Sequence, residues 1–118
     1  MSFDPVERLR LYHAAINALD YETIEAFFAE DAVYASPGVG DIAGRDAIVA
    51  AFRSYFAVYP DRVAGDDLVE ALSPRSARAV WRLVATDARN GAALRRRGEE
   101  IVSFDPAGKI LRIEVRDA

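Results

Sequence analysis

The stretch EEIVSFDPAGKILRIEV, residues 99–115, predicts two β-strands joined by a short turn. Strand side chains alternate between the two faces of a sheet, so Glu100 shares one face with Val102 and Phe104. A carboxyl group is costly to bury on an apolar face unless it has a partner or carries a proton. Glu100 is therefore predicted to belong to a site that handles protons.

Three helices are predicted upstream of this hairpin, at residues 5–18, 21–29 and 45–58. In each of them, apolar side chains recur at the three- and four-residue spacing of one helix face. Asp4 and Asp20 stand where N-cap residues accept hydrogen bonds from the first turn of a helix.

The strands that we expect cover residues 31–35, 62–72, 76–86, 92–104 and 109–115. Helices followed by strands favour the α+β class, in a single domain spanning residues 1–118. The segment 76–86 is apolar on both faces, whereas a sheet covered by helices on one side normally presents polar residues on the other. We therefore expect a second copy of the chain to cover this face, giving a homodimer through the sheet.

Composition argues against several classes of function. The 118 residues carry a net charge of −4, whereas nucleic-acid-binding proteins are usually basic, so no nucleic-acid partner is expected. The chain has no cysteine and one histidine, which argues against disulfides and transition-metal sites. It shows no signal-peptide pattern and no apolar run long enough to span a bilayer. These features predict a cytoplasmic protein without a membrane partner or a metal.

Four segments together carry a resemblance to a known family: YHAAINALD at 12–20, FAEDAVY at 28–34, GRDAI at 44–48 and FDPAGKI at 104–110. In this order and spacing the chain resembles the nuclear transport factor 2-like superfamily. That group includes ketosteroid isomerases, SnoaL-like polyketide cyclases, scytalone dehydratase and limonene epoxide hydrolase. The resemblance implies three N-terminal helices packed in the concavity of a strongly curved antiparallel sheet, a cone-shaped, cystatin-like α+β barrel around a mostly apolar pocket.

The resemblance also implies a catalytic pair. Ketosteroid isomerases hold a substrate oxygen between a tyrosine and a protonated aspartic acid. Counting along the matching segments places Tyr12 at the tyrosine position and Glu100 at the acid position. The general-base aspartate of the isomerase falls on Ser36, and serine is not a base near neutral pH. Glu100 is thus expected to act as general acid or base, with Tyr12 as hydrogen-bond donor.

Other residues are candidates for the pocket wall or for a replacement base. Those expected to bind the substrate are Tyr34, Ser36, Phe52, Tyr55, Val102 and Phe104. His13 could act as a base, although a lone helix histidine is more often a packing or surface residue. Asp41 could reach in from a loop at the rim, although a loop aspartate is more often solvated.

Glu100 has structural alternatives too. It could pair with Arg82 or with an arginine of the run at 95–97, or a bulge near Gly98 could turn it outward. The arginine run could recognise an anionic substrate, but such runs are more typical of a solvated strand edge.

The predicted function is an isomerase, cyclase or dehydratase that acts on a small hydrophobic carbonyl compound by acid–base chemistry. Such a reaction needs no metal or organic cofactor, because polar groups in a dry pocket can stabilise developing charge. The alternative is a non-catalytic ligand-binding or dimerisation module of the same fold.

Overall fold

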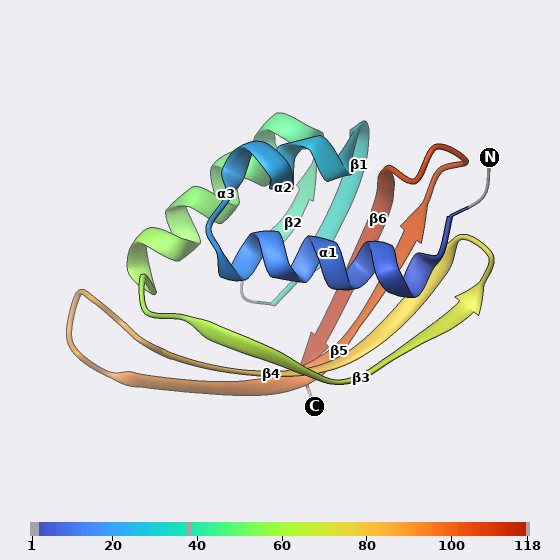
Figure 1. Cartoon of the computed structure of the whole chain (residues 1–118). Helices are drawn as coiled ribbons and strands as arrows, with labels where there is room; N and C mark the ends of the chain where they lie inside the picture. The colour runs from blue at the N-terminus through green and yellow to red at the C-terminus, as the bar shows by residue number, and fades with distance from the viewer. Residues whose placement is uncertain (1–2, 38, 118) are drawn as a thin grey trace.

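A computed structural model describes residues 3–37 and 39–117 of the chain. Within these residues, three helices lie on one side of a curved six-stranded sheet, which confirms the α+β class (Figure 1). The elements in chain order are α1 (Pro5–Asn17), α2 (Tyr21–Phe27), β1 (Phe28–Ser36), β2 (Gly40–Ala43), α3 (Arg45–Val58), β3 (Val63–Ser73), β4 (Ser76–Thr86), β5 (Ala93–Phe104) and β6 (Ile110–Asp117).

The first two helices begin at the aspartates predicted to cap them. Asp4 Oδ1 accepts hydrogen bonds from the backbone N–H groups of Val6 at 2.9 Å and Glu7 at 3.4 Å. Asp20 Oδ1 accepts one from the backbone N–H of Thr23 at 3.3 Å. The second helix is shorter than the 21–29 expected, because the backbone at Phe28 is already extended and begins β1.

The strands lie in the order β2-β1-β6-β5-β4-β3. Neighbouring strands are antiparallel except for β1 and β6, which run parallel, so the sheet is mixed and open. Strand β2 falls in a segment that the sequence did not predict as a strand. It forms because Val33 to Ser36 of β1 offer free backbone groups to residues 40–43.

The concave face of the sheet carries the side chains that meet the helices. Along β4 the inward residues are Ala77, Ala79, Trp81, Leu83 and Ala85, all of them buried. The small alanines leave room for α1, whose contacts with β3 and β4 close one side of the core. Figure 1 shows α1 lying across the hollow of the sheet.

The outer face of the sheet retains some apolar side chains. Val84 is 47% exposed and Leu68 is 46% exposed, in a setting that also holds Arg78 and Arg82. The homodimer expected from this face stays a prediction.

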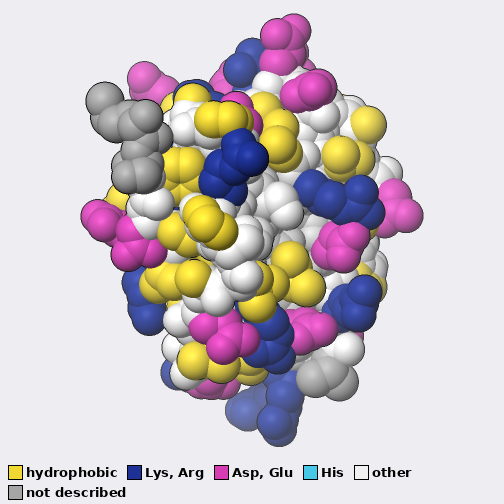
Figure 2. Space-filling view, turned by 90° about the vertical axis from the view of Figure 1, so that its right-hand side faces the viewer, with side chains coloured by type: hydrophobic (Ala, Val, Ile, Leu, Met, Phe, Trp, Pro, Cys, Tyr) yellow, Lys and Arg dark blue, Asp and Glu magenta, His cyan; other side chains and the backbone are white. Residues whose placement is uncertain are grey.

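At the end of the molecule shown in Figure 2, hydrophobic side chains are interspersed with charged ones. No helix in the part of the chain that the structure describes is long and apolar enough to cross a membrane.

Strand β6 departs from the simple alternation expected for residues 109–115. Its register with β5 shifts between Ser103 and Phe104. As a result Ile110 and Ile113 are both fully buried, whereas Leu111 is 37% exposed. A bulge here breaks the two-residue period, so Leu111 does not share the face of Ile113.

Gly98 does not form the bulge that was considered for it. The pairing of β4 with β5 runs without a register shift from Ser76 to Thr86, and Gly98 lies within it opposite Trp81. A Cβ at Gly98 would lie 1.9 Å from the backbone oxygen of Arg116 and 2.9 Å from the Trp81 ring. Glycine is needed here for the close approach of β6 and the indole.

Candidate functional site

A cavity of about 370 Å³ lies between the concave sheet and helices α1 and α3. One part of its wall is apolar and includes Phe52, Phe56, Trp81 and Leu83. Another part is polar and charged, with His13, Arg62, Asp66, Arg96 and Glu100 among its residues. The cavity is therefore suited to a small molecule that has both an apolar body and polar groups.

His13 bridges two carboxylates on the polar wall. Its Nδ1 lies 2.7 Å from Asp66 Oδ2, and its Nε2 lies 2.6 Å from Glu100 Oε1. Both distances are short, as hydrogen bonds between charged groups are. The three side chains form a continuous chain from β3 through α1 to β5, and we refer to Asp66, His13 and Glu100 as the carboxylate–histidine chain.

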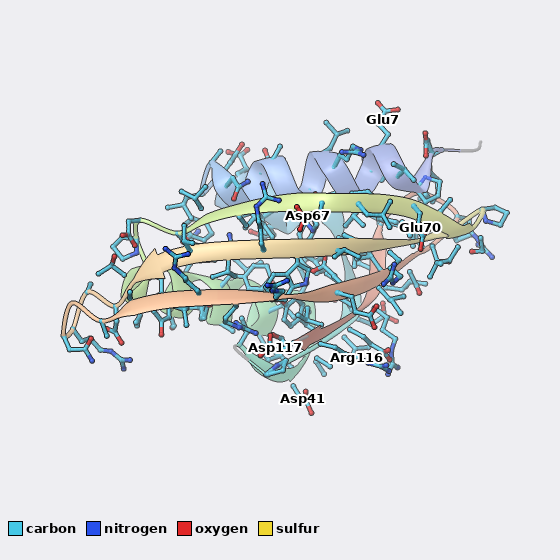
Figure 3. All side chains as sticks on the ribbon, turned by 90° about the horizontal axis from the view of Figure 1, so that it is seen from below. Glu7, Asp41, Asp67, Glu70, Arg116 and Asp117 are labelled. Carbon is cyan, nitrogen blue, oxygen red and sulfur yellow. The ribbon has the colours of Figure 1, made fainter. Side chains whose placement is uncertain are left out.

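Strand geometry explains why Asp66 and Glu100 point inward. Glu100 is 6% exposed and shares the buried face of β5 with Gly98, Val102 and Phe104, as the alternation predicts. Asp66 lies beside a register shift between Asp66 and Leu68 in the pairing of β3 with β4. The bulge at Asp67 lets that residue face outward, where it pairs with Arg82. Figure 3, seen from the outer side, shows Asp67 on this strand.

The carboxylates determine the charge of His13. Burial alone would lower the pKa of the imidazole, but the negative charge of Glu100 and the hydrogen bonds to Asp66 and Glu100 outweigh it and raise the pKa to about 10. At neutral pH His13 is therefore an imidazolium, and both ring N–H groups donate. The carboxylate–histidine chain thus pairs one imidazolium with two carboxyl groups.

Tyr12, the predicted hydrogen-bond donor, precedes His13 on α1 and is enclosed in the core. Its ring is fully buried and packs edge-on against Phe27 and Phe28, at centroid distances of 5.9 and 5.6 Å. Among the described residues its hydroxyl has no hydrogen-bond partner, and Tyr12 is absent from the cavity wall. Burial first, then the nearby Tyr34 and Glu100, raises its pKa, so the phenol stays protonated. The expected meeting of Tyr12 with Glu100 is replaced by the contact of His13 with Glu100.

The other predicted site residues lie in three places: the cavity wall, the core and the solvent-exposed edge of the sheet. Tyr34, Ser36, Phe52 and Tyr55 line the cavity. Val102 and Phe104 are buried in the core, and neither reaches the cavity. Asp41 is exposed on β2 and projects from the edge of the sheet into solvent (Figure 3).

Three cavity arginines (Arg10, Arg62 and Arg96) and Asp66 were not among the predicted site residues. Arg96 was grouped with a solvated strand edge, yet it lies on the inner face of β5, where it pairs with Asp117 at 2.7 Å and lies over the Trp81 ring. Strand alternation could have predicted the inward position of Arg96, because residues 96, 98 and 100 share one strand face. Arg62 and Asp66 had no comparable signal, since both lie where β3 begins or bulges.

No cluster of three or more His, Cys, Asp or Glu side chains arranged to hold a metal ion occurs in residues 3–37 and 39–117. The ring nitrogens of His13 are both occupied by hydrogen bonds to carboxylates. What the site offers is a proton-carrying chain on the wall of a partly apolar cavity.

A protein-family model described as "SnoaL-like domain" matches residues 9–113. No curated protein sequence matches the chain. Among solved structures, the epoxide hydrolase/cyclase-like enzyme SalBIII of pyran ring formation in the polyether salinomycin superposes with a TM-score of 0.82, at 20% identity over 95% of this chain and 88% of its own.

Two mycobacterial structures are comparably similar. RV0760c from Mycobacterium tuberculosis, in complex with estradiol-17beta-hemisuccinate, has a TM-score of 0.82 at 19% identity, covering 94% of this chain and 91% of its own. The Delta 5-3-ketosteroid isomerase from Mycobacterium sp. has a TM-score of 0.81 at 19% identity, covering 97% and 93%. At these identities the similarities establish the fold.

Proposed function

The chain belongs to the SnoaL-like domain family, and from this membership and the carboxylate–histidine chain we propose that it is an acid–base enzyme of the isomerase, cyclase or dehydratase type. Its substrate would be a small hydrophobic carbonyl compound. The observation that carries the proposal is His13, held at 2.6 and 2.7 Å between two carboxylates on a cavity wall.

Glu100 is the proposed general base. Its Oε1 is occupied by His13, whereas Oε2 has no hydrogen-bond partner within the described parts of the chain and is available to a substrate proton. When Glu100 accepts a proton it loses its charge, and His13 loses one of its two anionic neighbours. Asp66 remains to hold the imidazolium, so the proton on His13 is kept through the transfer. In this proposal Asp66 keeps His13 protonated while Glu100 carries the substrate proton.

Negative charge that develops on a substrate oxygen would need a hydrogen-bond donor in the cavity wall. Tyr34 lines the cavity with a phenol whose pKa is raised by burial and by Glu100, so its hydroxyl stays protonated at neutral pH. Fixed donors of this kind, in a site that excludes water, stabilise an enolate more than water does. Tyr12 remains a candidate donor only if a ligand or a side-chain rotation exposes its hydroxyl.

The substrate class is supported by the cavity and by related folds. A volume of about 370 Å³ with Phe52, Phe56 and Trp81 in its wall suits a compact hydrophobic molecule. RV0760c has been crystallised with estradiol-17beta-hemisuccinate, and the mycobacterial isomerase is named for ketosteroids. Their shared fold makes a hydrophobic ketone the first compound class to test.

The test is exchange of α-protons into deuterated water, which detects proton abstraction whatever the final product. Hydrophobic ketones such as 2-tetralone would be incubated with the protein and followed by proton NMR. Glu100→Gln should slow catalysed exchange by about a hundredfold or more. The matched control is Glu99→Gln, because Glu99 lies next along the strand on the outer face, where it pairs with Arg78 at 2.8 Å. Equal loss in both variants, or undiminished exchange in Glu100→Gln, would contradict the proposal.

A non-catalytic binding module is the second candidate. The observation that favours it is Ser36, which stands at the isomerase base position and hydrogen-bonds with Tyr34. This reading expects hydrophobic ketones to bind without any proton exchange above the buffer rate. Measured exchange that depends on Glu100 would exclude it.

We also propose that the outer face of the sheet joins two copies of the chain. Val84 and Leu68 are exposed there and would be buried in a homodimer. Light scattering on the purified protein tests this directly. A monomer at tens of micromolar protein would refute it.

A further inference from the structure

Arg62 is a partly buried cation of the cavity that has no ion-pair partner among the described residues. Among the described residues, its side chain forms no hydrogen bond or ion pair, and its Nε is enclosed without an acceptor. Each of the other largely buried charges has a partner: Asp66 and Glu100 bind His13, and Arg96 binds Asp117. Burial of a guanidinium without an anion is unfavourable, so this arrangement calls for an explanation.

The local backbone holds Arg62 in this position. It follows α3 in a turn closed by a hydrogen bond from its own N–H to the oxygen of Tyr59 at 3.2 Å. Its neighbour Asp61 faces the other way and accepts a hydrogen bond from the backbone N–H of Thr86 at 2.7 Å. The nearest carboxylate in sequence is therefore unavailable to Arg62.

The groups near the guanidinium are phenol hydroxyls, an aromatic ring and, without an ion pair, the carboxylate of Glu100. The Cζ of Arg62 lies 5.3 Å from the centroid of the Phe56 ring, a contact that compensates part of the lost hydration. Burial lowers its pKa, while the nearby phenols of Tyr55 and Tyr34 and the carboxylate of Glu100 oppose that effect. Arg62, Tyr34 and Tyr55 all line the cavity, so the same ligand can reach them.

The charge balance of the cavity favours an anion as well. Four cationic groups line it, namely Arg10, His13, Arg62 and Arg96, against the carboxylates Asp66 and Glu100 in the wall and Asp117, which pairs with Arg96. One positive charge is therefore left in excess. The chain as a whole carries a net charge of −4, so this excess of positive charge is local. A local positive field inside an acidic protein attracts an anionic ligand to the cavity.

We propose that the cavity binds hydrophobic carboxylic acids, with the carboxylate on Arg62 and the apolar body against Phe52, Phe56 and Trp81. A guanidinium presents parallel N–H groups that match a carboxylate. This inference rests on the proposed small-molecule function and narrows its substrate class to organic anions. In the substrate the carbonyl group would then lie between the carboxylate on Arg62 and the free oxygen of Glu100.

A pair of isosteric probes separates charge from shape. 4-tert-Butylbenzoic acid and 4-tert-butylbenzamide have nearly the same shape but differ in charge at neutral pH. Isothermal titration calorimetry should show the acid binding at least about tenfold more tightly than the amide. In Arg62→Gln that preference should vanish through loss of acid affinity, with the amide unchanged. Arg62→Lys should recover part of it, because charge returns without the planar fork.

Two control variants define the result. Arg82→Gln removes an exposed arginine from the outer face of the sheet, where it pairs with Asp67 outside the cavity, and should change acid affinity by less than about twofold. Glu100→Gln abolishes the proposed proton transfer but should keep or strengthen acid binding. Equal affinity for acid and amide in the wild-type protein would overturn the inference, as would an equal loss of both probes in Arg62→Gln.

The two proposals fail separately. Acid selectivity that depends on Arg62 without any proton exchange supports this inference and contradicts the enzyme. Proton exchange that depends on Glu100 without acid selectivity overturns this inference and leaves the enzyme. Arg62→Gln is expected to fold, since the substitution removes a buried charge that has no protein partner, and thermal unfolding should show an unchanged or higher Tm.

Discussion

Raising the pH should destabilise this protein through one residue. The pKa of His13 is about 10 in the folded chain, against 6.5 for an ordinary imidazole. Because the folded value is the higher one, the stabilisation is complete below pH 6.5 and declines as the pH rises towards 10. The full difference corresponds to a ceiling of about 5 kcal/mol, at about 1.4 kcal/mol per pH unit.

Urea unfolding followed at each pH from 6 to 9.5 measures this slope. The pH dependence in the middle of this range can be assigned to His13, because it is the only histidine and the chain has no cysteine. No other side chain of ordinary pKa titrates there. Asp66→Asn keeps a hydrogen-bonding group beside Nδ1 but removes one negative charge. This substitution should lower the pKa of His13, so the free energy of unfolding should stop falling at a lower pH.

A free energy of unfolding that stays constant between pH 7 and 9 in the wild-type protein would refute this reasoning. The imidazole would then be neutral or exposed, and the two short contacts would not exist in solution. The same result would remove the basis for Glu100 as a partnered base. Nitrogen chemical shifts of the imidazole give an independent readout, since they separate imidazolium from either neutral tautomer.

Three further outcomes are expected from single substitutions. Tyr12→Phe should leave the free energy of unfolding unchanged or raise it by up to about 1 kcal/mol, because the hydroxyl it removes has no acceptor among the described residues. A lower free energy in urea unfolding would instead show that the hydroxyl forms a hydrogen bond. Gly98→Ala should lower the free energy of unfolding by about 3 kcal/mol or more, because its Cβ would overlap the Arg116 carbonyl. The control Gly91→Ala, at φ 74° with open space around it, should lower it by only about 1 kcal/mol. Similar losses in the two variants would contradict the close approach at Gly98. Asp4→Ala should lower stability by about 1 kcal/mol through loss of the α1 cap, with Asp4→Asn largely preserving it, and thermal unfolding compares the two.

Regular periodicity made much of the fold predictable. Helix α3 and strand β4 have the bounds expected from apolar spacing and turn residues. The inward orientation of Glu100 followed from strand alternation alone. These elements are long and periodic, and the information that specifies them is local.

The partners of Glu100 were not predictable in the same way. Neighbouring residues of a helix differ in direction by about 100°, so a family comparison that places Tyr12 does not show which of Tyr12 and His13 meets β5. Asp66 turns inward because a bulge follows it. Gly65 is typical of an irregular strand, but it does not show which of Asp66 and Asp67 faces the cavity. Irregular backbone and helix rotation are decided by tertiary packing.

The position of Arg62 shows a third kind of limit. An arginine between a helix and a strand is typical of a solvated loop. Arg62 is enclosed only because the folded chain builds a cavity around it. Charged residues are seldom buried without partners, so sequence reasoning assigns them to the surface by default.

The place of β6 has a consequence for how the chain matures on the ribosome. This strand is the last to be synthesised among the elements described, yet it lies in the interior of the sheet between β1 and β5. Until it emerges, the β1–β2 pair and the β3–β4–β5 meander have no strand to join them, and each leaves an unprotected edge. A nascent chain that pauses before residue 110 therefore offers chaperones two half-sheets rather than a folded protein.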